Sequence, residues 1–234
     1  MLKAERGLRS SWLSTARKWS RPRTSALQAA RLRVAARLAA LLLPLVPSAG
    51  AQTDATWTGG AAGNWSDGTQ WNTNPNYPQN EIPGPGDRYN AIFGGIASVV
   101  LSEDITIDRL TASSLFTLSN GFELNLNEGF NLDSLFNRTL DGVTVNLLGG
   151  TSIFAGTGVL NMGSGAVLNN HALLEWRTIA DVAFIGGAGV QINNLAGATL
   201  RKTVGTEALR IGNSFTLNNS GTIDIAAGEL PAPK

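Results

Sequence analysis

The sequence predicts an all-β protein built as a parallel β-helix, a solenoid whose coils stack along one axis. Short runs of Val, Ile, Leu, Phe and Thr alternate with polar residues, and Gly, Asn or Ser interrupts them every few positions. This pattern is typical of strands joined by turns, and no stretch shows the apolar stripe of a helix. An Asn-Asn pair also recurs, with its first residue at Asn169, Asn193 and Asn218, which lie 24 and 25 residues apart. A period of this length fits one coil of a β-helix.

The charge of the chain divides it into two parts. The 234 residues carry a net charge of +1, yet residues 1–51 hold ten Lys or Arg against one acid, Glu5, which leaves +9. The other eight basic and sixteen acidic residues give residues 52–234 a charge of −8. Because residues 52–234 are acidic, they disfavour binding to nucleic acid, and we expect no nucleic-acid partner. The lack of Cys excludes disulfide scaffolds and thiolate metal sites.

Residues 1–51 have the order of a signal peptide with an extended basic region. Nine largely apolar residues, 38–46, follow the basic stretch, and small residues lead to Ala51. This order predicts Sec-type export with cleavage after Ala51. The apolar run is much shorter than the ~20 residues of a membrane-spanning helix, so we expect no transmembrane segment in the mature chain. A start codon near Val34 would explain the long basic region; a nucleic-acid arm and a mitochondrial transit peptide are the alternatives.

Residues 52–90 are predicted to form a Trp-rich N-terminal cap. The segment contains Trp57, Trp65 and Trp71 among Gly and Asn residues. One interpretation places the three indole rings over the end of the solenoid core, because a solenoid needs a cap for solubility. The other makes Trp57, Trp65 and Trp71 a glycan-stacking platform. Its polar partners would be Asn64, Asp67 and Asn72.

Residues 91–230 are predicted to form the coils, about six of them, and residues 231–234 a C-terminal tail. Apolar alternation marks the expected strands, which are 98–101, 105–107, 122–126, 143–147 and 222–225. The Asn pairs are expected at corners, in the left-handed backbone conformation, with side chains that hydrogen-bond along the axis.

Extending the repeat towards the N-terminus places four leucines in one column, namely Leu101, Leu124, Leu147 and Leu168. Leucine-rich repeats share the period, but their spaced leucines and helical return segment are missing. An antiparallel sandwich is the main alternative fold; it explains the strands but not the returning Asn pair.

A family resemblance rests on the tryptophan segment, the Pro-Gly turn at 83–87 and the later Asn-Asn elements. Trp57-Thr-Gly-Gly leads to Asn64-Trp65-Ser-Asp and then Trp71, and elements such as Asn218-Asn-Ser-Gly-Thr-Ile follow. Together they resemble secreted bacterial passengers of the autotransporter type that carry autotransporter-associated β-strand repeats. The resemblance implies a right-handed parallel β-helix at the surface of a Gram-negative bacterium, often in adhesion. Such passengers end in a translocating domain that has no counterpart in this sequence, so the resemblance implies either export beyond the periplasm by another route or a truncated member.

The sequence offers little material for catalysis. A Ser-His-Asp system would depend on His171, the single histidine, which has no G-x-S-x-G nucleophile turn beside it. β-Helices also include polysaccharide lyases and hydrolases, whose sites align acids and bases on one face. The candidates here are Asp181, Arg201, Glu207, Arg210 and Asp224. We expect these charges to be solvated on the outer face, and we predict no catalytic residue and no cofactor.

Metal binding has weak support as well. Calcium requires only oxygen ligands, so a site at Asp67, or near Asp104 and Asp108, is an alternative to the absence of metal that we predict.

The sequence thus predicts a secreted, non-enzymatic β-solenoid of the cell surface, with a role in adhesion or in the cell envelope. The expected partners are a surface glycan or a neighbouring β-solenoid. A glycan-binding module and a polysaccharide-acting enzyme are the alternatives.

Overall fold

The chain forms strands wherever apolar and polar residues alternate, and a computed structural model describes residues 51–82, 84–178, 182–186, 188–205 and 215–228. These residues belong to one compact unit, Pro47–Lys234. Within them the structure contains twenty strands and one 3₁₀ helix. The predicted signal peptide, apart from Ala51, and the predicted tail at 231–234 lie outside the described residues.

The strands form three sheets, and every strand pair within them is parallel. Sheet I has eight strands, in the order β1 (Gln52–Thr56), β3 (Arg88–Phe93), β6 (Arg109–Ala112), β9 (Phe130–Ser134), β12 (Thr151–Gly156), β15 (Leu173–Arg177), β18 (Thr199–Lys202) and β20 (Thr222–Ile225). Sheet II consists of β2 (Ala62–Asn64), β4 (Ala97–Val100), β7 (Phe116–Ser119), β10 (Arg138–Asp141), β13 (Leu160–Gly163) and β16 (Val182–Gly186). Sheet III consists of β5 (Ile105–Ile107), β8 (Glu123–Leu126), β11 (Thr144–Leu147), β14 (Val167–Asn170), β17 (Gln191–Asn194) and β19 (Thr216–Asn219).

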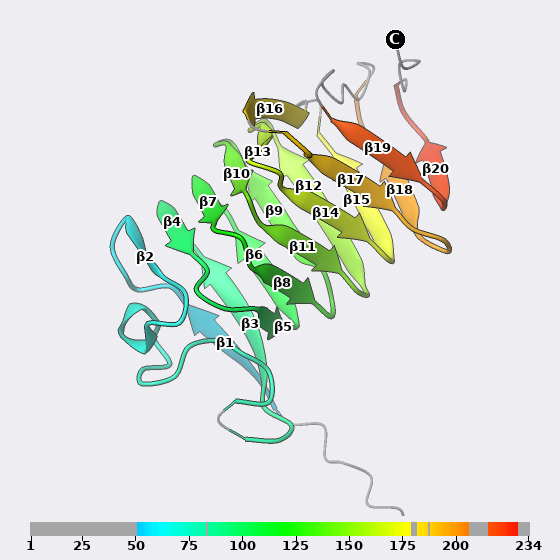
Figure 1. Cartoon of the computed structure of the whole chain (residues 1–234). Coiled ribbons are helices and arrows are strands. Elements are labelled where there is room, and N and C mark those ends of the chain that lie inside the picture. Colours follow the sequence, from blue (N-terminus) through cyan, green and yellow to red (C-terminus); the bar gives the residue numbers. More distant parts are fainter. Residues whose placement is uncertain (1–50, 83, 179–181, 187, 206–214, 229–234) are drawn as a thin grey trace, which may run out of the picture. The chain divides into compact units, whose positions relative to one another are not determined.

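Each coil contributes one strand to each sheet, in the order II, III, I. Five complete coils run from β4–β5–β6 to β16–β17–β18 in the described part of the chain, and β19 and β20 belong to a further one. Figure 1 shows the coils stacked in sequence order, from cyan at β2 to red at β20. The predicted all-β solenoid is therefore confirmed, with five complete described coils where about six were expected.

The core consists of inward side chains that stack in columns from coil to coil. In sheet II, for example, Val99, Leu118, Leu140 and Met162 occupy one register position and are at most 4% exposed. Successive side chains of a strand point to opposite faces, so each four-residue strand supplies two residues to the core. Stacking buries each inward apolar residue against the coils on both sides, which no single coil could achieve.

The sequence located the strands well but misaligned the coils before Asn169. The strand predicted at 105–107 is β5, and those predicted at 122–126 and 143–147 agree with β8 and β11 within one residue. The leucine column, however, is wrong. Leu124 and Leu168 do share a column, but it passes through Val145, whereas Leu147 pairs with Leu126.

The Asn pairs occupy strand ends and not corners. Asn169 pairs in register with Asn193 and Asn193 with Asn218, as the sequence predicted, but all three lie within β14, β17 and β19. The expectation of a left-handed Asn corner is wrong at these positions. Apart from Gly156 at the end of β12, positive φ angles fall instead on residues between strands, mostly glycines such as Gly129 and Gly150, and also on Asn120 (φ 83°). Glycine has no Cβ and adopts this conformation without strain.

The N-terminal segment belongs structurally to the solenoid. β1 pairs with β3 and β2 pairs with β4, so both extend the sheets beyond the first complete coil. The 3₁₀ helix Gly68–Gln70 lies in the loop between β2 and β3. The boundary predicted at residue 90 falls inside β3.

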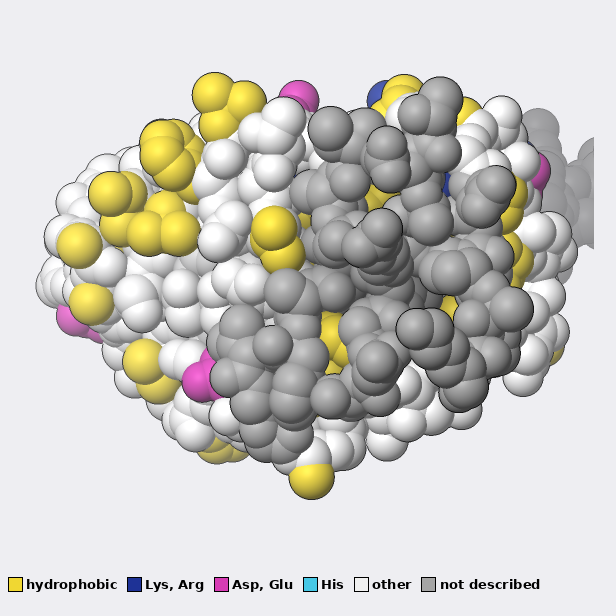
Figure 2. Space-filling view, turned by 90° about the horizontal axis from the view of Figure 1, so that it is seen from above, with side chains coloured by type: hydrophobic (Ala, Val, Ile, Leu, Met, Phe, Trp, Pro, Cys, Tyr) yellow, Lys and Arg dark blue, Asp and Glu magenta, His cyan; other side chains and the backbone are white. Residues whose placement is uncertain are grey.

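Several hydrophobic side chains are exposed at the corners between sheets I and II. Ile96, Leu115, Leu135 and Phe136 precede β4, β7 and β10, and they are 38% to 74% exposed. Figure 2 shows hydrophobic side chains grouped on the face in view, where charged side chains are sparse.

Candidate functional site

The three tryptophans of the cap pack against one another and against the core. Trp65 and Trp71 are 0% and 1% exposed, and Trp57 is half-buried. The rings of Trp57 and Trp65 each lie 5.1 Å, centroid to centroid, from that of Trp71. Phe93 of β3 lies 5.3 Å from the Trp71 ring and joins this cluster to the first coil. The cluster therefore fills the N-terminal end of the core.

The glycine-rich loop is shaped by the Trp57 ring. A Cβ atom at Gly59 or Gly63 would come within 2.9 Å of this ring, so the loop backbone can approach it only because both residues are glycine. The Trp57 Nε1–H donates to the carbonyl of Gly60 at 3.0 Å. This loop therefore covers much of the one Trp ring that is not fully buried.

The glycan-stacking interpretation does not fit these positions. Trp65 and Trp71 expose no ring face, and their Nε1–H groups donate to the carbonyls of Pro78 and Trp65. The three side chains proposed as polar partners of a glycan accept hydrogen bonds from the backbone of the cap segment. Asn64 accepts from the backbone N–H of Ser66, Asp67 from that of Thr69 and Asn72 from that of Thr56. Of the two interpretations, the structure favours the cap.

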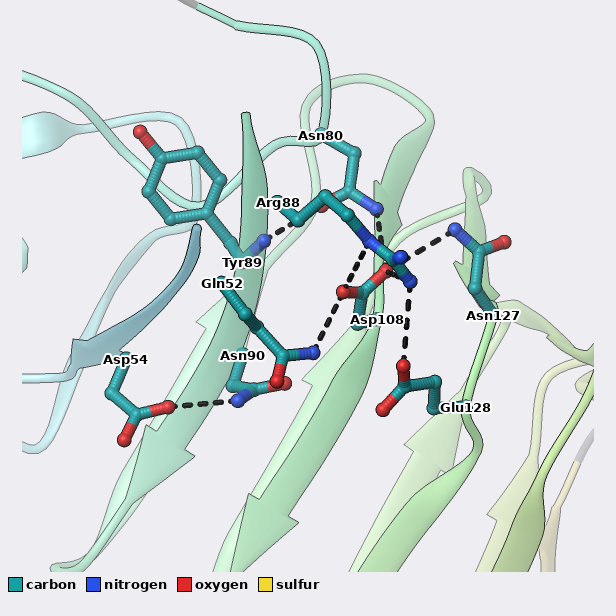
Figure 3. A network of polar contacts seen from close by, with 9 residues as sticks. All are labelled: Gln52, Asp54, Asn80, Arg88, Tyr89, Asn90, Asp108, Asn127 and Glu128. Carbon is teal, nitrogen blue, oxygen red and sulfur yellow. Dashed lines mark hydrogen bonds and ion pairs between the residues drawn. The ribbon is translucent and has the colours of Figure 1, made fainter. Parts of the chain in front are cut away.

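Asp108, which immediately follows β5, is bonded to four other side chains of the described residues, those of Gln52, Asn80, Arg88 and Asn127 (Figure 3). Its side chain is fully buried, although it carries a charge. Arg88 of β3 contacts both carboxylate oxygens, through Nε at 2.7 Å and Nη2 at 2.8 Å. Gln52 of β1 donates to Oδ2 at 2.7 Å and Asn80 donates to Oδ1 at 3.0 Å. Asp108 thus ties the cap segment and the first coil together.

The N–H groups that bond the Asp108 carboxylate determine its protonation state and whether its oxygens are available to a metal ion. Burial raises the pKa of Asp108, but hydrogen bonds from Arg88, Gln52 and Asn80 outweigh it and hold the pKa below its ordinary value. Both oxygens accept hydrogen bonds from N–H donors, so binding of calcium at Asp108 would have to displace these donors. At Asp67 the oxygens accept from Thr69 and Gln70.

Asp104 accepts from the backbone N–H of Glu123. The described residues contain no group of three or more His, Cys, Asp or Glu side chains that could hold a metal ion.

A hollow of about 550 Å³ opens beside Asp108, and we call it the Asp108 hollow. It is lined by polar side chains, namely those of Gln79, Asn80, Glu81, Arg88, Thr106 and Asn127. Several polar groups here make no hydrogen bond within the described residues, including Arg88 Nη1, Gln79 Nε2 and Asn127 Oδ1. Arg88 supplies the guanidinium of this lining. Three carboxylates lie around it, those of Glu81, Asp108 and Glu128, so the net charge at the hollow is negative.

The outer face of sheet III carries a ladder of amides that leads away from this hollow. We call it the outer amide ladder, and it consists of Asn125, Asn146, Asn169, Asn193 and Asn218. In each step the Nδ2 group donates to the Oδ1 of the preceding coil at 2.7–2.8 Å, across 21, 23, 24 and 25 residues of sequence. Thr106, which lines the hollow, occupies the next register position before Asn125. The stacked amides that the sequence predicted are therefore confirmed.

A second amide ladder lies on the inner face of the same sheet. It consists of Asn170, Asn194 and Asn219, and here each Nδ2 donates towards the C-terminus, at 2.8 and 2.7 Å. Asn170 and Asn194 are 1% exposed, and each also donates to a backbone carbonyl of sheet I. Their polar groups are satisfied, as burial requires.

The charged residues proposed for a polysaccharide-acting enzyme are partly described. Arg201 and Asp224 face each other on sheet I, with Nε 2.8 Å from Oδ2, and Glu175 lies on the other side of Arg201 at 3.8 Å. Glu175 also pairs with Arg177. These side chains form a chain of ion pairs along the solenoid.

The remaining enzyme candidates are Asp181, Glu207 and Arg210, which lie outside the described residues. His171 is exposed at the end of β14.

Arg138 is a buried residue that the sequence analysis overlooked. Its side chain is fully buried in β10, and its guanidinium donates to the carbonyls of Leu132, Ser134, Phe136 and Ala155 at 2.6–3.0 Å. The guanidinium carbon lies 4.3 Å from the centroid of an aromatic ring, that of Phe154. Burial lowers the pKa of Arg138 to about 10, so it stays charged at neutral pH. The sequence could have indicated this burial, because Arg138 lies two residues before the core residue Leu140 and side chains two apart in a strand point to the same face.

Comparison of the chain with models of protein families, with curated proteins and with solved structures finds no match. No helix among the described residues is long and apolar enough to span a membrane.

Proposed function

We propose that this chain is a secreted, non-enzymatic β-solenoid that acts at the surface of a Gram-negative bacterium, in adhesion or as part of the cell envelope. The outer amide ladder carries the proposal. It repeats the same uncharged hydrogen-bonding group on each coil from Asn125 to Asn218. Such a face suits many similar contacts along its length, whereas a catalytic site needs different groups that converge on one point.

The charged side chains support the same function. In the described residues the buried Asp108 is held by Arg88, and Asp224 by Arg201. A general acid or base must be free to exchange a proton with its substrate. These carboxylates are engaged in ion pairs, which favours a structural role over the lyase or hydrolase alternative.

Export and processing test the proposal directly. The gene is expressed with an epitope tag at the C-terminus in a Gram-negative host, and the medium, envelope and cytoplasmic fractions are probed. We expect the tagged protein outside the cytoplasm, with an N-terminus at Gln52. Retention of the full-length chain in the cytoplasm contradicts the proposal. Release of unsaturated or reducing ends from polysaccharides by the purified protein would favour the enzyme alternative.

A further inference from the structure

We propose that the Asp108 hollow and the outer amide ladder together form a binding site for a neutral, linear polysaccharide that lies along the solenoid axis. The inference rests on the proposed surface function and names its ligand class. The hollow holds one end of the polymer, and successive coils of sheet III each contact one sugar unit.

The two parts are continuous. Thr106 lines the hollow and pairs in register with Asn125, the first rung of the ladder. Every rung donates towards the N-terminus, and the Nδ2 group of Asn125 makes no hydrogen bond within the described residues. The donor end of the ladder is thus directed towards the hollow, where Arg88 Nη1 and Gln79 Nε2 are further unused donors.

The chemistry of the lining selects hydroxyl-rich ligands. A primary amide has two donors and an acceptor oxygen, so Asn125, Asn169 and Asn193 keep an unused donor after they have bonded to their neighbours. Asn146 and Asn218 use their second donor within the protein, towards Glu123 and Gln191. Neighbouring hydroxyls of a pyranose ring can use a donor and an acceptor at once. The hollow, at about 550 Å³, has the size of a small-molecule site.

The charge of the site argues for a neutral polymer. One guanidinium, that of Arg88, is outnumbered by the carboxylates of Glu81, Asp108 and Glu128. An anionic polymer such as a polyuronate is repelled by this excess. Nucleic acid is excluded for the same reason, because its binding depends on neutralising phosphates with Lys and Arg.

The spacing of the coils argues for sugars over peptides. Neighbouring strands of a sheet lie about 4.8 Å apart, whereas an extended peptide advances about 3.3 Å per residue and soon falls out of step with the ladder. The pyranose unit of an extended polysaccharide has a length comparable with the coil spacing. One unit can therefore occupy each coil over several coils.

The test measures binding of the purified protein to neutral β-1,4-linked gluco-oligosaccharides of increasing length by isothermal titration calorimetry. Oligogalacturonates of the same lengths are the charged comparison. We expect affinity for the neutral series to rise with length up to the number of rungs, and weak or no binding of the uronates. Absence of neutral binding, length-independent binding, or stronger binding of the uronates would each overturn the inference.

Three variants locate the site. Asn127→Ala removes a lining side chain of the hollow and Asn169→Ala removes a central rung, and each should weaken binding about tenfold, the effect of one or two hydrogen bonds. Asn161→Ala is the matched control for Asn169→Ala, because both residues are half-buried and outward, but Asn161 lies on sheet II. Circular dichroism melting identifies any variant that fails to fold, and in that case Asn127→Ser or Asn169→Ser, which keep a short uncharged polar side chain, replace it. Equal weakening by Asn161→Ala would refute this location.

The outcome is separable from that of the proposed function. Binding is measured on purified protein and does not depend on export. If the protein is exported and processed but binds no neutral oligosaccharide, only the binding-site proposal is contradicted. If the protein is retained in the cytoplasm, only the proposed surface function is contradicted.

Discussion

Replacement of Asp108 by Asn tests whether the buried carboxylate holds the cap segment to the first coil. The change is nearly isosteric but converts an acceptor of five N–H groups, two from Arg88 and one each from Gln52, Asn80 and Asn127, into a group with one acceptor oxygen and an NH₂. That NH₂ must face the N–H groups of Arg88, Gln52 or Asn80, which lie 2.7–3.0 Å from the present oxygens. Of the other carboxylates around Arg88, only the partly exposed Glu128 lies within salt-bridge distance, at 3.3 Å.

The expected loss of unfolding free energy follows from these contacts. Breaking a buried ion pair costs about 3–5 kcal/mol, and a hydrogen bond to a charged group contributes about 1.5–3 kcal/mol. The Arg88 side chain is 38% exposed and regains hydration in the variant, so we expect the lower range, about 2–3 kcal/mol. For a unit of this size that corresponds to a melting temperature lower by roughly 5–10 °C. Thermal unfolding followed by far-UV circular dichroism measures it.

The same variant should change the dependence of stability on pH. The hydrogen bonds hold the pKa of Asp108 below its unfolded value of about 3.9, so below pH 5 the unfolded chain binds more protons than the folded one. The stabilisation is complete above the unfolded pKa and is lost as the pH falls through the folded pKa. Asp108→Asn lacks this component, so its melting temperature should fall less between pH 5 and pH 3.

A matched control removes the outer partner of the same arginine. Glu128→Gln changes a carboxylate that is 41% exposed, and we expect less than about 0.5 kcal/mol. Melting of Asp108→Asn within about 1 °C of the wild type at pH 7 would refute the reasoning. So would an unchanged acid dependence.

Three further predictions use the same melting assay. Asn194→Ala should cost about 2–3 kcal/mol because the buried amide of Asn170 loses its acceptor and the carbonyl of Thr222 loses a donor, whereas Asn193→Ala on the half-exposed outer face should cost less than about 1 kcal/mol; equal losses would contradict the distinction. Gly59→Ala should destabilise the cap, because its Cβ meets an indole ring at 2.9 Å, and Gly60→Ala, with nothing within 4 Å, should be nearly neutral. Arg138→Met should cost about 3–5 kcal/mol because four carbonyls lose their hydrogen bonds to the guanidinium, and a neutral result would show that these bonds contribute little.

Local pattern made the strands predictable. Alternation over four residues depends only on which side chains face the core, so the segments around β8 and β11 could be located from the sequence alone. The Asn pairs in β14 and β17 indicated the register between these coils, because an Asn-Asn pair rarely recurs at a regular spacing by chance.

Contacts between distant segments could not be predicted in the same way. Leu124 and Leu147 are equally good core residues, and a spacing of 23 looked as regular as the true 21 between Asn125 and Asn146. The partners of the Asp108 carboxylate come from positions 19 to 56 residues away, so its burial depends on the completed fold. Charged residues at strand ends have the same local pattern whether they are solvated or buried.

The inner amide ladder explains how coils of unequal length keep one register. Coil length grows from 21 to 25 residues between Asn125 and Asn218, so length alone does not align the strands. In the earlier coils the inner position is apolar, with Leu126 and Leu147 in line, and from β14 onwards it is Asn. A slip of one residue would turn Asn194 outward and leave the amide of Asn170 buried without its partner. A buried amide stabilises little when it is satisfied and costs about 1–3 kcal/mol when it is not, so the ladder acts mainly against wrong registers.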